Sequence, residues 1–176
     1  MQFKTALLAL GIIGMPGLAM ASNTIKFQGL VNTSTCSVTV NNTATAIVVL
    51  PTVSAAALGT TGATAGETNF TVGVSGCVSD PADKVLKVGF VGNNVNATGH
   101  MMNTGTATNV ELVVSSLSNG TILNLSNWTS QTAADGITLL AGSTSAERDY
   151  FVRYYATGAT TVGTVAGSMQ YSISYP

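Results

Sequence analysis

The chain has 176 residues, with 6 basic and 7 acidic side chains and a net charge of −1. Charged residues make up only 7% of the chain, compared with about a quarter in typical soluble domains, and the 45% hydrophobic content argues against disorder. This balance excludes nucleic acid and acidic membrane surfaces as expected partners, because both attract basic patches.

The first 21 residues are typical of an export signal. Lys4 precedes an apolar run at 6–13, and Ala19 to Ala21 supply the small residues that signal peptidase recognises. The alternative, a membrane anchor, is less favoured because a spanning helix needs roughly 20 apolar residues. Cleavage after Ala21 removes Lys4, which leaves 5 basic and 7 acidic residues and a net charge of −2. We therefore predict a signal peptide at 1–21 followed by one domain of ordinary size.

Short strand-like runs separated by turn signals follow along the rest of the chain. Residues 25–31 and 36–40 alternate apolar and polar side chains, whereas 46–50 is continuously apolar up to Pro51. Residues 52–68 are small and rich in Gly and Thr, which predicts a loop with short strand pieces. The later strand-like runs are 69–74, 85–91, 110–114, 137–140, 150–155 and 163–175. Many short strands without a helical period predict an antiparallel sandwich of immunoglobulin-like type, or a barrel.

Two cysteines, Cys36 and Cys77, follow the predicted signal. One pair in an exported chain favours a disulfide, which would close a loop of about 40 residues and contribute roughly 4 kcal/mol in the chain-entropy model. The alternative, a pair of metal ligands, lacks further His or Cys partners to complete a zinc site.

Residues that could carry catalysis are few. The single histidine, His100, lies in a predicted loop with nothing local to orient it, so a surface position is expected. The carboxylates fall in predicted turns or on polar strand faces, and no short loop gathers enough of them for calcium. We predict that the chain is not an enzyme and needs no metal or cofactor. The remaining candidates for function are the edge strands of the predicted sheets.

The last predicted strand, 163–175, is long, uncharged and free of interior proline. Natural sheets usually blunt such an edge, because open N–H and C=O groups invite pairing with another chain. Residues 22–35 form a second unprotected strip, which has no turn linking it to the next strand.

A set of short motifs occurs in order along the chain. They are Ile25-x-Phe27-x-Gly29-x-Val31, then Cys36-x-Val38, then Phe70-x-Val-x-Val74 before Cys77, then Arg153-Tyr-Tyr-Ala-Thr-Gly158, with Gly163 fourteenth from the end and Tyr175 penultimate. Together they resemble the subunits of bacterial chaperone–usher fimbriae, the type 1 and P pilus group, over the whole mature chain. No single motif is specific, but the ordered set is.

The resemblance implies an incomplete immunoglobulin-like sandwich at 36–176 that lacks its last strand and is completed in trans by donor-strand complementation. Residues 22–35 would be the donor extension, inserted through Ile25, Phe27, Gly29 and Val31. The acceptor groove, which also binds the chaperone, would be formed by Gly163, Val165, Met169, Tyr171, Ile173, Tyr175 and Pro176. A proline at the end departs from the polar residue expected there.

The implied partners are neighbouring fimbrial subunits, a periplasmic chaperone and an outer-membrane usher, with export through the periplasm to a surface fibre used in adhesion. Two alternatives stay open. The chain could be a tip or minor adaptor subunit, although a tip adhesin would need a second domain. It could also be a secreted carbohydrate-binding, lectin-like domain, with Trp128 stacking on a sugar, although loop packing is the favoured role of Trp128.

Overall fold

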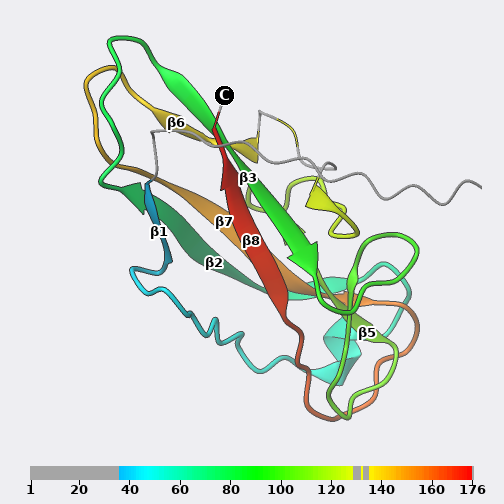
Figure 1. Cartoon of the computed structure of the whole chain (residues 1–176). Coiled ribbons are helices and arrows are strands. Elements are labelled where there is room, and N and C mark those ends of the chain that lie inside the picture. The colour runs from blue at the N-terminus through cyan, green and yellow to red at the C-terminus, as the bar shows by residue number, and fades with distance from the viewer. Residues whose placement is uncertain (1–35, 129–131, 133–134, 176) are drawn as a thin grey trace, which may run out of the picture. The chain divides into compact units, whose positions relative to one another are not determined.

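The computed structural model describes residues 36–128, 132 and 135–175, which form two antiparallel sheets (Figure 1). The predicted signal peptide, the predicted donor extension and Pro176 lie outside the described residues. The elements in chain order are β1 (Ser37–Val40), the 3-10 helix η1 (Ala55–Leu58), β2 (Thr64–Ser75), β3 (Lys84–Gly92), β4 (Met101–Met102), β5 (Val110–Ser115), β6 (Ile137–Leu139), β7 (Ala146–Ala156) and β8 (Met169–Ser174).

The larger sheet has five strands in the order β1-β2-β7-β5-β4, and the long β2–β7 pair forms its centre. Strand β2 begins earlier than predicted, because residues 64–68 join it rather than remain in a loop. Its register against β7 shifts between Ala65 and Thr68, where Gly66 adopts a positive φ of 64°. Glycine adopts a positive φ readily, so Gly66 permits this irregular backbone. Because the irregularity interrupts the alternation of apolar and polar residues, the sequence did not predict this part of the strand.

The smaller sheet has three strands in the order β6-β3-β8. Its central strand β3 carries Leu86, Val88 and Phe90 on the buried face, as predicted. The last strand begins at Met169 and not at Gly163, so the regular part of β8 is shorter than the predicted run.

Three aromatic rings join the two sheets at the centre of the core. Phe70 on β2 and Tyr150 on β7 stack with their centroids 5.8 Å apart, and both meet the ring of Phe90 on β3 edge-on. All three side chains are fully buried, and the Tyr150 hydroxyl donates a hydrogen bond to the Asp135 carbonyl. Edge-to-face and offset stacking add stability beyond the buried area. The chain is therefore all-β, as predicted.

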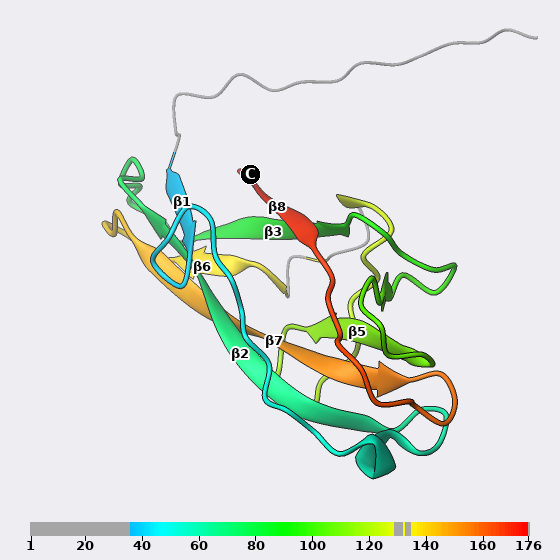
Figure 2. The same ribbon diagram turned by 90° about the horizontal axis from the view of Figure 1, so that it is seen from below.

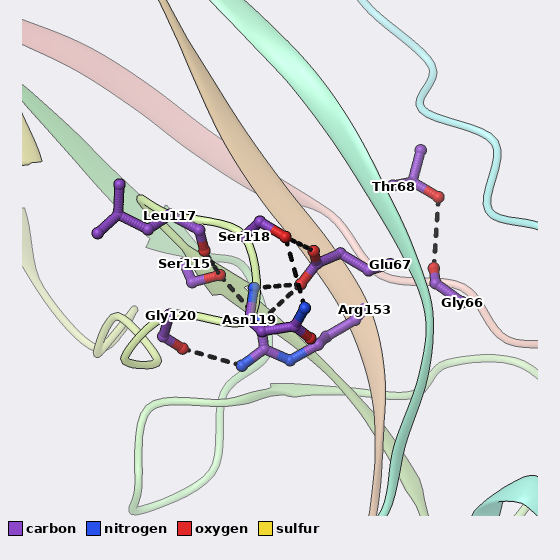
Figure 3. Close-up of polar contacts among 9 residues, drawn as sticks. All are labelled: Gly66, Glu67, Thr68, Ser115, Leu117, Ser118, Asn119, Gly120 and Arg153. Atoms are coloured by element: carbon purple, nitrogen blue, oxygen red, sulfur yellow. Dashed lines mark hydrogen bonds and ion pairs between the residues drawn. The ribbon is translucent and has the colours of Figure 1, made fainter.

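A buried arginine fixes the 115–120 segment to the larger sheet (Figure 3). The Arg153 guanidinium donates to Glu67 Oε2 at 3.1 Å, to Ser115 Oγ at 2.9 Å and to the Gly120 carbonyl at 3.0 Å. Glu67 also accepts hydrogen bonds from the Ser118 hydroxyl and the Asn119 backbone N–H. Arg153, which begins the motif Arg153-Tyr-Tyr-Ala-Thr-Gly158 noted in the sequence, is thus the centre of a polar network.

The same network makes part of the stability depend on pH. Burial raises the pKa of the Glu67 carboxyl, but the hydrogen bonds from Ser118 and Asn119 and the Arg153 charge outweigh it, so the pKa lies below its usual value of 4.5. A group with a lowered folded-state pKa stabilises the fold above its unfolded-state pKa, and this stabilisation is lost as the pH falls through the folded value.

We therefore expect Glu67→Gln to lower the free energy of unfolding by about 1 kcal/mol at pH 7, with a difference from wild type that shrinks between about pH 5 and pH 3. Urea unfolding across this pH range measures the effect. Glu147→Gln, which changes an exposed carboxylate on β7, is the matched control. A difference for Glu67→Gln that stayed constant with pH would contradict the assignment.

Candidate functional site

Strand β8 has a partner on one side only among the described residues. It pairs with β3 from Gly92↔Met169 to Lys87↔Ser174, and it ends the smaller sheet. Its side chains alternate between half-buried and exposed, so Met169, Tyr171 and Ile173 face the core. The strand therefore presents an open, uncharged backbone edge next to a row of apolar side chains.

A second open edge lies across from β8. Residues 44–51, here called the unpaired wall, connect β1 to η1 and make no backbone–backbone hydrogen bond with any described residue. Ala46, Val48 and Leu50 pack against the core, whereas Ile47 and Val49 are 87% and 79% exposed. The predicted strand at 46–50 is thus strand-like in its alternation but has no partner among the described residues, and so forms no sheet there.

An apolar groove of about 510 Å³ lies between the unpaired wall and the final segment of the chain. Its floor is made by Phe70, Phe90 and Val152, which are buried core residues of both sheets. In Figure 2 the unpaired wall (cyan) and β8 (red) are two separate segments, and both contribute residues to the lining of the groove. An apolar groove bounded by two free backbone edges suits an extended peptide with apolar side chains at alternate positions.

The predicted acceptor residues fall into three groups. Val165, Met169 and Tyr171 line the groove. Ile173 and Tyr175 are half-buried against the core further along the chain, and the Tyr175 hydroxyl accepts a hydrogen bond from the Cys36 backbone N–H at 2.8 Å. Gly163 does not line the groove. The structure does not describe Pro176 or the predicted donor residues Ile25, Phe27, Gly29 and Val31.

Comparison with known proteins gives the family. Residues 25–176 match the family model described as "Fimbrial protein". The chain belongs to the fimbrial protein family. Members are structural subunits that assemble with other subunits into surface fibres, so this fimbrial subunit is exported to the cell surface.

Individual relatives agree with the family model. The fimbrial subunit is 35% identical to the "Major fimbrial subunit SMF-1" of Stenotrophomonas maltophilia, over 88% of this chain and 93% of the relative. It is 31% identical to the "F17 fimbrial protein" of Escherichia coli, over 93% of this chain and 96% of the relative. Its fold is that of the P pilus rod subunit PapA, with a TM-score of 0.60 at 13% identity, covering 80% of this chain and 99% of that structure. This is the incomplete immunoglobulin-like sandwich that the sequence predicted.

Gly163 of the fimbrial subunit lies where two main chains pack closely, and it is not among the residues that line the groove. A Cβ at this position would lie 2.5 Å from the Ala107 backbone nitrogen, and one at Gly105 would lie 2.2 Å from the Thr164 carbonyl oxygen. These contacts let residues 103–108 and 160–166 pair main chain to main chain, with Ala107 N donating to Thr164 O at 3.0 Å. Through this pairing, Thr164 and Ala166 bond with the 103–108 segment, and β8 begins only at Met169.

The two cysteines are joined by the predicted disulfide, with a Cα–Cα distance of 4.4 Å. It fixes Cys36, which directly follows the predicted extension, to Cys77 beyond the end of β2. The Tyr175 contact to Cys36 places the last described residue of the fimbrial subunit next to its first.

The single histidine is not the exposed loop residue that the sequence predicted. The His100 side chain is only 12% exposed, and its Nδ1 lies 2.9 Å from Glu111 Oε2. Asn96 donates to the other carboxylate oxygen of Glu111, and the ring meets Tyr155 edge-on. Glu111 lies on β5, so no local sequence pattern could have shown that it orients His100.

In the part of the fimbrial subunit that the structure describes, no three His, Cys, Asp or Glu side chains gather into a group that could hold a metal ion. No helix in the same residues has the length and apolar character needed to cross a membrane.

Proposed function

We propose that this fimbrial subunit polymerises by donor-strand exchange. A strand of a periplasmic chaperone fills the groove first. At the outer-membrane usher, the extension of a neighbouring subunit replaces it and inserts Ile25, Phe27, Gly29 and Val31. The subunit reaches the surface through the periplasm, as a structural and non-catalytic part of the fibre. The observation that carries the proposal is the apolar groove between two open edges, the unpaired wall and β8.

Two kinds of interaction support this function. An inserted strand can form backbone hydrogen bonds with both edges, while its alternate side chains enter the groove. Each large apolar side chain that becomes fully buried contributes about 1.5–3 kcal/mol. The donor and the acceptor are different surfaces of one chain, so the contact is head-to-tail and builds a filament instead of a closed dimer.

The donor side of the joint can be tested at Gly29, where the proposed insertion needs a residue without a side chain. We expect Gly29→Leu to stop polymerisation, because the bulky side chain would meet the groove floor, while the complex with the chaperone still forms. Electron microscopy of surface fibres and co-purification with the chaperone measure the two effects.

Gln28→Leu is the matched control, because it adds the same side chain in the phase that points away from the groove. This variant should form normal fibres. Normal fibres from Gly29→Leu would overturn the donor assignment, and a mature subunit that stays monomeric without chaperone and captures no added peptide of residues 22–35 would overturn the open groove.

A further inference from the structure

The unpaired wall is attached at both ends by tyrosine hydroxyl groups. The Tyr171 hydroxyl donates to the Ala44 carbonyl at 3.3 Å, and the Tyr154 hydroxyl donates to the Pro51 carbonyl, also at 3.3 Å. Tyr154 lies on β7 of the larger sheet, and Tyr171 lies on β8 of the smaller sheet. The wall is therefore suspended between the two sheets by one side chain from each.

The rings of both tyrosines are themselves held in place by packing. Each is half-buried and packs against the main hydrophobic core, and Tyr154 also contacts the second cluster around Leu58. The ring of Tyr154 lies so close to Gly66 that a Cβ there would be 2.8 Å from it. Burial also raises the pKa of Tyr154, which keeps its hydroxyl protonated as a donor. Such rings are rigid spacers because packing fixes them along their length.

Between these two attachment points the Thr45 carbonyl accepts a hydrogen bond from the Thr43 hydroxyl at 3.2 Å, and the main chain of residues 46–50 is free to pair. Its peptide groups form no backbone–backbone hydrogen bond with the described residues, and Ala46, Val48 and Leu50 provide only apolar contacts. A strand that enters between the wall and β8 needs the two edges separated by roughly 9.5 Å, which is twice the spacing of neighbouring strands. A wall held only by apolar contacts could close on β8 or drift from it.

We propose that Tyr154 and Tyr171 are positioning residues for strand addition, which brace the two ends of the unpaired wall at a separation that admits one strand. The inference rests on the proposed function and deepens it. Bracing keeps the open groove ready for a strand, so that less ordering is required when one binds. The two hydroxyls act on the wall and leave its central peptide groups for the incoming backbone.

The test is capture of a labelled synthetic peptide of residues 22–35 by the oxidised mature subunit, with the peptide in large excess so that subunits do not join one another. We expect Tyr154→Phe and Tyr171→Phe each to weaken peptide binding about fivefold, the weight of one neutral hydrogen bond, and the double variant to weaken it about 25-fold. Native mass spectrometry over a series of peptide concentrations gives the fraction of subunit in the 1:1 complex and hence the affinity, and stopped-flow mixing gives the association rate.

Tyr155→Phe is the matched control, because it makes the same change next to Tyr154 on a ring that packs against His100. It should bind the peptide like wild type. Thermal unfolding of each variant separates bracing from a general loss of stability, and either single variant suffices if the double variant does not fold.

The possible outcomes distinguish a failure of the proposed positioning role of Tyr154 and Tyr171 from a failure of strand addition itself. If wild type captures the peptide and the folded Phe variants bind it as tightly or more tightly, the brace is overturned and strand addition stands. If wild type captures no peptide, the proposed function fails and the brace fails with it.

Discussion

Arg153→Met is expected to lower the free energy of unfolding of the subunit by about 3 kcal/mol. The Arg153 side chain is only 7% exposed, and the variant leaves the partly buried Glu67 carboxylate without its cation. The carbonyl of Gly120 and the Ser115 hydroxyl lose a donor as well. Removing one partner of a buried pair typically costs about 3–5 kcal/mol. We place this variant at the lower end because Arg153 Nε has no hydrogen-bond partner among the described residues.

Urea unfolding at pH 7 measures the loss. The double variant Arg153→Met, Glu67→Gln is the informative control, because removing the unpaired charge should recover part of the stability. A loss below about 1 kcal/mol for Arg153→Met would show that the network contributes no more than a surface ion pair.

Ile173→Asp is expected to abolish strand capture. Ile173 packs against the core on the inward face of β8, so an aspartate there would place an unpaired charge against apolar side chains. Affinity for the peptide of residues 22–35 should fall by roughly 100-fold or more, the equivalent of about 3 kcal/mol. In cells, a subunit that the chaperone cannot capture should be degraded.

The control for this variant is Ser174→Asp, which adds the same charge on the next residue. Ser174 is exposed and lies opposite Lys87 in the β3–β8 pair, so an aspartate is tolerated there. The fraction of subunit bound to peptide, from native mass spectrometry, and the periplasmic level of each variant are the measurements. Unchanged capture by a folded Ile173→Asp subunit would contradict the role of the inward face of β8.

Alternation along single strands predicted much of the fold. The buried face of β3 could be read directly, because Leu86, Val88 and Phe90 recur at every second position. On β5 the same alternation missed Val113, which is also fully buried. The start of β2 could not be read, because Gly66 interrupts its register against β7. Local sequence indicates a strand, but it does not show a bulge that only the neighbouring strand reveals.

Only one side of the groove, the β8 side, could be predicted from the sequence. Met169 and Tyr171 stand out because their strand alternates cleanly, whereas residues 46–50 of the unpaired wall are all apolar, so the inward phase there could not be chosen. The role of Gly163 depends on backbone contacts with Ala107, and the setting of His100 depends on Glu111. Contacts between distant segments of this kind leave no periodic signal in the sequence.

The disulfide has a mechanical consequence for a fibre joined through the residues before Cys36. Tension on such a joint enters the domain at Cys36 and passes across the sulfur–sulfur bond to Cys77, whose Cα lies 4.4 Å away. Residues 37–76, which include β1, the unpaired wall and β2, form a covalently closed loop beside that load path. In the fibre that we propose, the disulfide would therefore keep this side of the groove attached to the domain when one joint is pulled, so the groove would still hold the other neighbour.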